Sequence, residues 1–247
     1  MRYILILCLT LVATPLRAHN TDAHVISNML AAFYHVLSHA VIDKLALSSS
    51  ANSERDASML SVMLIHRFYE ENAAADHATD TNFGFVDKND IRFQVSDPSD
   101  YWRAHGTSVS LFNDLVCVFY GGNPVERNTL SNALGLSERR KKTCVTEFER
   151  AFDDWEPVLD ELEVIRARGR GEPLQFRADR TADPVHAEVL RHEVWALNKA
   201  LQLPAPVDVT MRACNRENVS YMADRSEIVI CTEYLAYLAI SAEALHD

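Results

Sequence analysis

The sequence predicts an α+β fold that is predominantly helical, with a small β element near the C-terminus. Only seven glycines occur among 247 residues, which disfavours a chain rich in strands and turns. Apolar residues recur at three- and four-residue spacing through most of the chain, as amphipathic helices require. Two short strand-like runs, 207–213 and 227–231, occur only near the C-terminus. With 48% hydrophobic residues, the chain can bury a core as one domain or two small ones.

The first residues, 1–18, are expected to be a signal peptide rather than part of the fold. Arg2 provides a short positive segment, 4–13 is an apolar run too short to span a bilayer comfortably, and Ala18 ends an acceptable cleavage site. An uncleaved N-terminal anchor is the alternative. No later segment is expected to cross a membrane. The mature protein, 19–247, is therefore predicted to be exported and soluble, in the periplasm or secreted.

The N-terminal half of the mature chain is predicted to form two helices and a polar loop. Apolar residues at helical spacing predict one helix over 24–47. A second helix is expected to start at an N-cap, Ser53, and to fade near residue 70. The stretch 73–104 is rich in Asp and Asn and is predicted to be a loop, with a short strand at 91–95.

The C-terminal half is predicted to contain most of the remaining helices. A helix through 109–120 stops at a Gly-Gly-Asn-Pro turn, and two more helices follow, the longer one spanning 138–164. The basic, glycine-containing segment 165–183 is expected to be a flexible linker. A helix over 184–201, the two strands and a terminal helix complete the mature chain.

Four cysteines of the mature chain are predicted to form two disulfides. An even number of cysteines in an oxidising compartment is typical of disulfides and here allows three connectivities. Pairing Cys117 with Cys144 and Cys214 with Cys231 closes the shorter loops and is favoured. A zinc site built from these cysteines is disfavoured because no pair has the short C-x-x-C spacing.

A pair of histidines in the first predicted helix has the spacing of metal ligands. His35 and His39 project one turn apart, so both imidazoles could reach one zinc ion. A zinc peptidase of this type places glutamate directly after the first histidine, as general base for the attacking water. Val36 occupies that position. The alternative interpretation is that two histidines one turn apart are only partly exposed polar residues, because this spacing recurs by chance.

Another histidine, in the helix predicted over 184–201, is a weaker candidate for a metal ligand. His192 and Glu193 begin like the same motif, but Ala196 stands where the second histidine would be needed. These residues are therefore predicted to form an ordinary helix face. The net charge of −11 also disfavours nucleic acid and anionic lipid as partners.

Short motifs follow one another in a fixed order along the mature chain. They are HVLSHA at 35–40, ANSERDAS at 51–58, His105, Cys117 with YGGNP at 120–124, CNRENVSY at 214–221 and CTEYL at 231–235. In this order they resemble the HELGHA, EEDAAD-like, His-Ser-Leu-Asp, Cys…YGSDP, CGEPNAFYDP and CYEL motifs of a family of bacterial zinc metallopeptidases with an uncharacterised domain. The resemblance covers nearly the whole mature chain and all four of its cysteines.

The resemblance implies a zincin-like metallopeptidase scaffold in a single domain over 19–247, with zinc as cofactor. It assigns His35, His39 and Glu54 as metal ligands, with His105 as a candidate fourth ligand. Ser58 stands where the family has an aspartate that would orient a ligand histidine. Losing such a carboxylate costs about 10- to 100-fold in metal affinity or activity.

These departures lead to two function hypotheses. Losing the general base costs on the order of 10²–10⁴-fold in rate, so the first is a metallopeptidase homologue that is catalytically impaired or inactive. Such a protein could still bind zinc, and a peptide or protein ligand in the old substrate cleft. The alternative is an active zinc peptidase with another carboxylate as base, either Glu54 or Glu233. Glu233 could lie at the site periphery or serve as a helix cap. A structural envelope protein without metal is a third interpretation.

Overall fold

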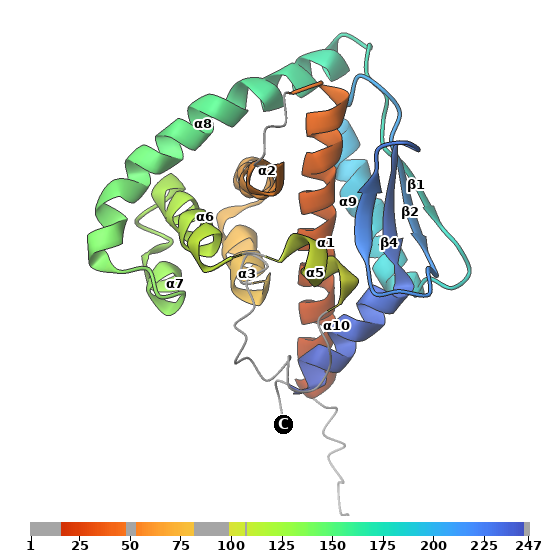
Figure 1. Cartoon of the computed structure of the whole chain (residues 1–247), viewed down its shortest axis with the longest axis horizontal. Helices are drawn as coiled ribbons and strands as arrows, with labels where there is room; N and C mark the ends of the chain where they lie inside the picture. Colours follow the sequence, from red (N-terminus) through yellow and green to blue (C-terminus); the bar gives the residue numbers. More distant parts are fainter. Residues whose placement is uncertain (1–15, 48–52, 82–98, 107, 245–247) are drawn as a thin grey trace, which may run out of the picture.

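The computed structural model of the chain describes residues 16–47, 53–81, 99–106 and 108–244 (Figure 1). Its long first helix, α1 (Leu16–Lys44), runs through the middle of the molecule. A group of helices lies on one side of α1 and a small sheet on the other (Figure 1). The predominantly helical α+β prediction is confirmed, with the sheet formed by the C-terminal part of the chain.

The remaining described helices include the ones that the apolar spacing predicted. The second predicted helix begins at Ser53, and the long helix predicted over 138–164 extends to residue 167. The helices are α2 (Ser53–Phe68), α3 (Glu71–Thr81), α5 (Asp100–His105), α6 (Val109–Gly122), α7 (Asn128–Ala133), α8 (Glu138–Ala167), α9 (Pro184–Ala200) and α10 (Thr232–Ala244). Helix α8 contains Pro157 and arches over the helical side of the molecule (Figure 1).

The described parts of the polar stretch 73–104, residues 73–81 and 99–104, were wrongly predicted to be a loop. They contain most of α3 and all but the last residue of α5. The buried face of α3 consists of small and polar residues at helical spacing (Ala74, His77, Ala78 and Thr81), so it carries no large apolar side chain that would reveal the period. The strand predicted at 91–95 lies outside the described residues.

The sheet has four strands in the order β1-β2-β4-β3. They are β1 (Gln175–Ala178), β2 (Asp208–Arg212), β3 (Val219–Met222) and β4 (Glu227–Cys231). Strands β1, β2 and β4 run parallel, and β3 is antiparallel to β4. Helix α9 connects β1 to β2, which makes a βαβ unit. The sheet packs on α1 through β3 and β4.

Two of the four strands were not predicted. Strand β1 lies inside 165–183, the segment predicted to be a flexible linker, so this segment is partly structured. Only Phe176 of this edge strand is half-buried and its neighbours are exposed, so the sequence shows no clear alternation of apolar and polar residues. Strand β3 has only four residues, of which Val219 alone is fully buried.

Helix α1 is also the centre of the hydrophobic core. By length and composition alone, residues 22–44 are apolar enough to cross a membrane, a feature of this helix that was not anticipated. However, 78% of this apolar stretch is buried inside the protein. It packs against α2, α3, α10 and the sheet, and this burial accounts for its apolar composition.

The cysteines form the two pairs that the sequence favoured. Cys117 and Cys144 join α6 to α8 with an S–S distance of 2.02 Å. Cys214 and Cys231 join the segment after β2 to the end of β4, at 2.15 Å. Gly121 allows α6 and α8 to approach closely, because a Cβ there would lie 2.1 Å from the Cys144 carbonyl oxygen.

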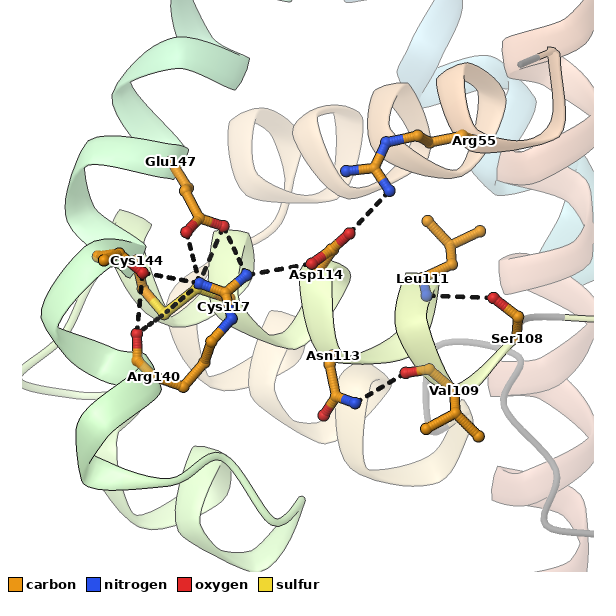
Figure 2. A network of polar contacts seen from close by, with 11 residues as sticks. Arg55, Ser108, Val109, Leu111, Asn113, Asp114, Cys117, Arg140, Cys144 and Glu147 are labelled. Carbon is orange, nitrogen blue, oxygen red and sulfur yellow. Dashed lines mark hydrogen bonds and ion pairs between the residues drawn. A yellow bond between two sulfur atoms is a disulfide. The ribbon is translucent and has the colours of Figure 1, made fainter. Parts of the chain in front are cut away.

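A chain of ion pairs beside the first disulfide fixes the start of α2 (Figure 2). Arg140 of α8 donates to Glu147, and to Asp114 of α6 at 3.1 Å. Asp114 also accepts from Arg55 of α2 at 2.7 Å. The first turn of α2, which carries Glu54, is thereby tied to α6 and α8.

Candidate metal centre

The two histidines of the first motif lie side by side on α1. His35 is 6% exposed, and His39 is half-buried one turn later. Their ring centroids are 4.9 Å apart, and their Nε2 atoms approach to 3.3 Å. The helix therefore presents two imidazole nitrogens to one point, as the spacing of four residues predicts.

Glu54 and His105 bring two further ligand atoms to the same point. Glu54, in the first turn of α2, places Oε2 3.1 Å from His35 Nε2 and Oε1 3.3 Å from His39 Nε2. His105, the last residue of α5, places Nδ1 2.9 Å from Glu54 Oε2 and 3.3 Å from His35 Nε2. All four ligand atoms lie within 4.8 Å of one another. The structure thus brings together all the metal ligands that the resemblance assigned.

The spacing of these atoms fits a tetrahedral metal ion. Zinc bonds to nitrogen and oxygen of 2.0–2.1 Å place tetrahedral ligand atoms about 3.3 Å apart. The contacts above range from 2.9 to 3.3 Å. Hydrogen bonds alone cannot account for all of these contacts. A neutral imidazole nitrogen carries either one proton or one lone pair, so it makes one such bond. His35 Nε2 has three polar neighbours within 3.3 Å.

The electrostatics of the cluster favour a cation at its centre. Burial lowers the pKa of His35 to about 4, so its imidazole is neutral and offers a lone pair at neutral pH. Burial acts to raise the pKa of Glu54, but its polar contacts with His105, His35 and His39 bring it well below its usual range. Glu54 therefore stays ionised. Neutral imidazoles and an ionised carboxylate are the forms that bind zinc.

The outer nitrogen of His35 has a weak partner. Its Nδ1 lies 3.4 Å from the hydroxyl oxygen of Ser58, a buried residue one turn after Glu54 in α2. A hydrogen bond of this length is marginal. A cavity of ≈ 60 Å³ adjoins both side chains, and its polar lining includes His77 of α3. The site therefore has room at position 58 for a larger acceptor.

Val36 does not supply a general base, and no other residue of the first motif replaces it. Val36 is fully buried in the hydrophobic core.

Glu233 lies in a different group, with Cys214 and Cys231. Its carboxylate accepts hydrogen bonds from the backbone N–H groups of Cys214 at 3.0 Å and Asn215 at 2.6 Å. Glu233 therefore anchors the segment after β2, and both cysteines of its group are held in the disulfide.

Sequence reasoning missed Tyr101 as a member of the site. This buried residue of α5 packs its ring 5.1 Å from that of His105 and 6.4 Å from that of His35. Burial holds its pKa well above the ordinary value, so the phenol stays protonated. An aromatic residue four positions before His105, in an otherwise polar stretch, was the available signal.

This fold and cluster define a protein with a candidate metal site formed by three histidines and one glutamate. A profile of the domain family DUF4344, described as "Putative metallopeptidase", matches residues 11–159, more than half of the chain. The chain therefore belongs to this family. The match includes all four residues of the cluster, whereas the sheet and the motifs at 214–221 and 231–235 lie outside it. No curated protein and no solved structure matches the chain.

Proposed function

We propose that the protein is a zinc-binding member of the metallopeptidase family that does not hydrolyse peptides. The observation that carries the proposal is the convergence of four ligand atoms from α1, α2 and α5 within 4.8 Å. Structural zinc sites have four protein ligands, whereas catalytic sites have three and an open position. With His105 as the fourth ligand the site is closed. Zinc bound there would cross-link three helices.

The buried Val36 supports the loss of peptidase activity. A general base contributes on the order of 10²–10⁴-fold to rate, and valine can neither accept nor relay a proton. The active alternative needs another carboxylate as base. Glu54 contacts all three histidines of the cluster, and Glu233 is held by backbone N–H groups elsewhere. Neither contact pattern favours that alternative.

The family and the N-terminus support a scaffold, a ligand class and a location for the protein. A zincin-like scaffold would account for two ligand histidines on one helix and a ligand glutamate on the next. A peptide or protein is the ligand class that a metallopeptidase homologue would retain. The apolar N-terminus and the two disulfides support export to the periplasm or outside the cell.

Metal analysis of the purified mature protein tests the ligand set. We expect about one zinc per chain in the wild type. We expect none in His39→Ala, and no change in His192→Ala, which removes an exposed histidine on α9. Equal zinc content in the wild type and the His39→Ala variant would contradict the proposed site.

Peptide hydrolysis tests the loss of activity. We expect no zinc-dependent hydrolysis by the wild type and weak hydrolysis by the Val36→Glu, Ser58→Asp double variant, provided that circular dichroism shows it folded. Readily measured wild-type activity that disappears in His35→Ala would overturn the inactive assignment while leaving the metal site intact.

A further inference from the structure

A second pocket lies between α1, the α2–α3 junction and α9, and it shares no lining residue with the cavity at the metal centre. Its volume is ≈ 300 Å³. The side chains that line it are aromatic, aliphatic or acidic, and none is basic: Tyr34, Phe68, Tyr69, Glu70, Ala73, Glu193, Ala196 and Leu197. Glu70, Ala73 and Ala196 are exposed, so the pocket is open to solvent along this rim.

Glu193 is the polar centre of this pocket. The hydroxyl of the fully buried Tyr34 donates to Glu193 Oε1 at 2.5 Å, and the hydroxyl of Tyr69 donates to the same oxygen at 3.3 Å. Burial above all, with the nearby Glu193, raises the pKa of both tyrosines, so both hydroxyls remain donors. Neither hydroxyl bonds to the second oxygen, Oε2.

The charge of Glu193 has no cationic partner in the described part of the chain. Glu193 is half-buried, and no ion pair joins it to a described Lys, Arg or His. The nearest lysine along α9, Lys199, lies instead over the ring of Trp195, 3.4 Å from its centroid. A partly buried carboxylate without a counter-ion attracts a cation more strongly than an exposed one, because water screens it less.

Aromatic rings complete a cation-binding environment. The rings of Tyr34 and Tyr69 meet edge to face, 5.7 Å between centroids, and Phe68 lines the same pocket. The face of an aromatic ring attracts an ammonium group within about 6 Å of its centroid. The apolar Leu197 and two alanines offer contact to an alkyl chain.

We infer that this pocket binds a primary alkylammonium group, the chemistry shared by a lysine side chain and an aliphatic diamine. The ammonium donates a hydrogen bond to Glu193 Oε2 and lies against the half-buried rings of Phe68 and Tyr69, while the alkyl chain fills the apolar part of the pocket. A quaternary ammonium fits less well because it has no N–H to donate to Oε2. This site does not depend on the proposed metal function.

Calorimetric titration of the purified mature protein with n-butylammonium tests the inference. We expect saturable binding that weakens with added salt, and at least tenfold weaker binding of n-butanol, which has the same chain without the charge. We expect tetramethylammonium to bind more weakly than n-butylammonium. Equal affinity for n-butanol would overturn the cation site, and equal affinity for tetramethylammonium would overturn its assignment to a primary amine.

Two matched variants on α9 locate the site. Glu193→Gln keeps the shape of the side chain and removes its charge, so we expect n-butylammonium to bind about tenfold more weakly or not at all. Glu188→Gln, which changes an exposed carboxylate paired with Arg191, should leave affinity unchanged. Unchanged affinity in a folded Glu193→Gln variant would overturn the inference. Titrations with cadaverine and with N-acetyl-lysine amide then show which source of the ammonium group the pocket prefers.

Discussion

At the scale of single residues, position 58 is where a side chain could orient His35 through its outer nitrogen. The Ser58 hydroxyl lies 3.4 Å from His35 Nδ1, and the adjoining cavity of ≈ 60 Å³ leaves room for a carboxylate. A ligand histidine that donates to a carboxylate is oriented better and is a stronger ligand.

We therefore predict that Ser58→Asp binds zinc about 10- to 100-fold more tightly than the wild type, measured by competition with a chromogenic chelator. Ser61→Asp is the matched control, because Ser61 lines the same cavity but donates to the Ser58 carbonyl rather than to His35. Unchanged or weaker zinc affinity in Ser58→Asp would contradict this role for position 58.

A second residue-scale prediction concerns His77 and pH. Burial lowers the pKa of His77 from its ordinary value of 6.5 to about 4. Between these values the unfolded chain binds more protons than the folded one, so the free energy of unfolding falls as pH decreases from about 6.5 toward 4. From pH 7 to pH 5 the His77 contribution is a loss of about 2 kcal/mol.

The His77→Gln variant should lose this part of the pH dependence. Urea unfolding at pH 7 and pH 5 measures it, with His192→Gln as a control at an exposed position. If the wild type and His77→Gln lose equal stability over this interval, the burial of a neutral His77 does not contribute.

At the scale of elements, prediction succeeded where a large apolar face or a local motif marks the element. Helix α8 and the second helix, with its start at Ser53, follow the apolar spacing, and His35 and His39 share a face because a helix dictates it. Helix α3 was missed because its buried face consists of small and polar residues. Strand β1 was missed because Phe176 is its only half-buried residue, so no alternation marks it.

Local sequence patterns likewise predicted only part of the candidate site. Spacing alone paired His35 with His39, whereas Glu54 came from the resemblance. The position of His105 depends on α5, which was assigned to a loop, and on long-range packing that no local pattern encodes. Glu193 was interpreted as part of an ordinary helix face, because its two tyrosine partners are 124 and 159 residues away in sequence.

The disulfide between α6 and α8 is expected to stabilise the helical side of the molecule. It closes a loop with a sequence separation of 27. Loop-closure entropy for that length predicts that a Cys117→Ser, Cys144→Ser variant loses about 3.5 kcal/mol of unfolding free energy. Urea unfolding checks the loss. Zinc content should persist, because neither cysteine contacts the cluster, and a variant of unchanged stability would contradict the expected contribution.

At the scale of the whole molecule, α1 connects the two halves and carries two of the four candidate metal ligands, His35 and His39. The same helix packs against α2 and α3 on one side and the sheet on the other (Figure 1). Metal bound by α1, α2 and α5 would therefore stabilise the region where the core elements meet. A ligand that binds only the folded state raises stability by mass action.

Zinc should therefore raise the melting temperature of the whole protein. At a free zinc concentration about 1,000 times the Kd the gain is about 4 kcal/mol. For a domain of this size it corresponds to a rise in Tm of roughly 8–16 °C. Calorimetry with zinc and with excess EDTA measures the shift, which should vanish in His39→Ala and persist in His192→Ala. A shift of equal size in His39→Ala would show that zinc acts elsewhere on the chain, because the cluster has then lost a ligand without consequence.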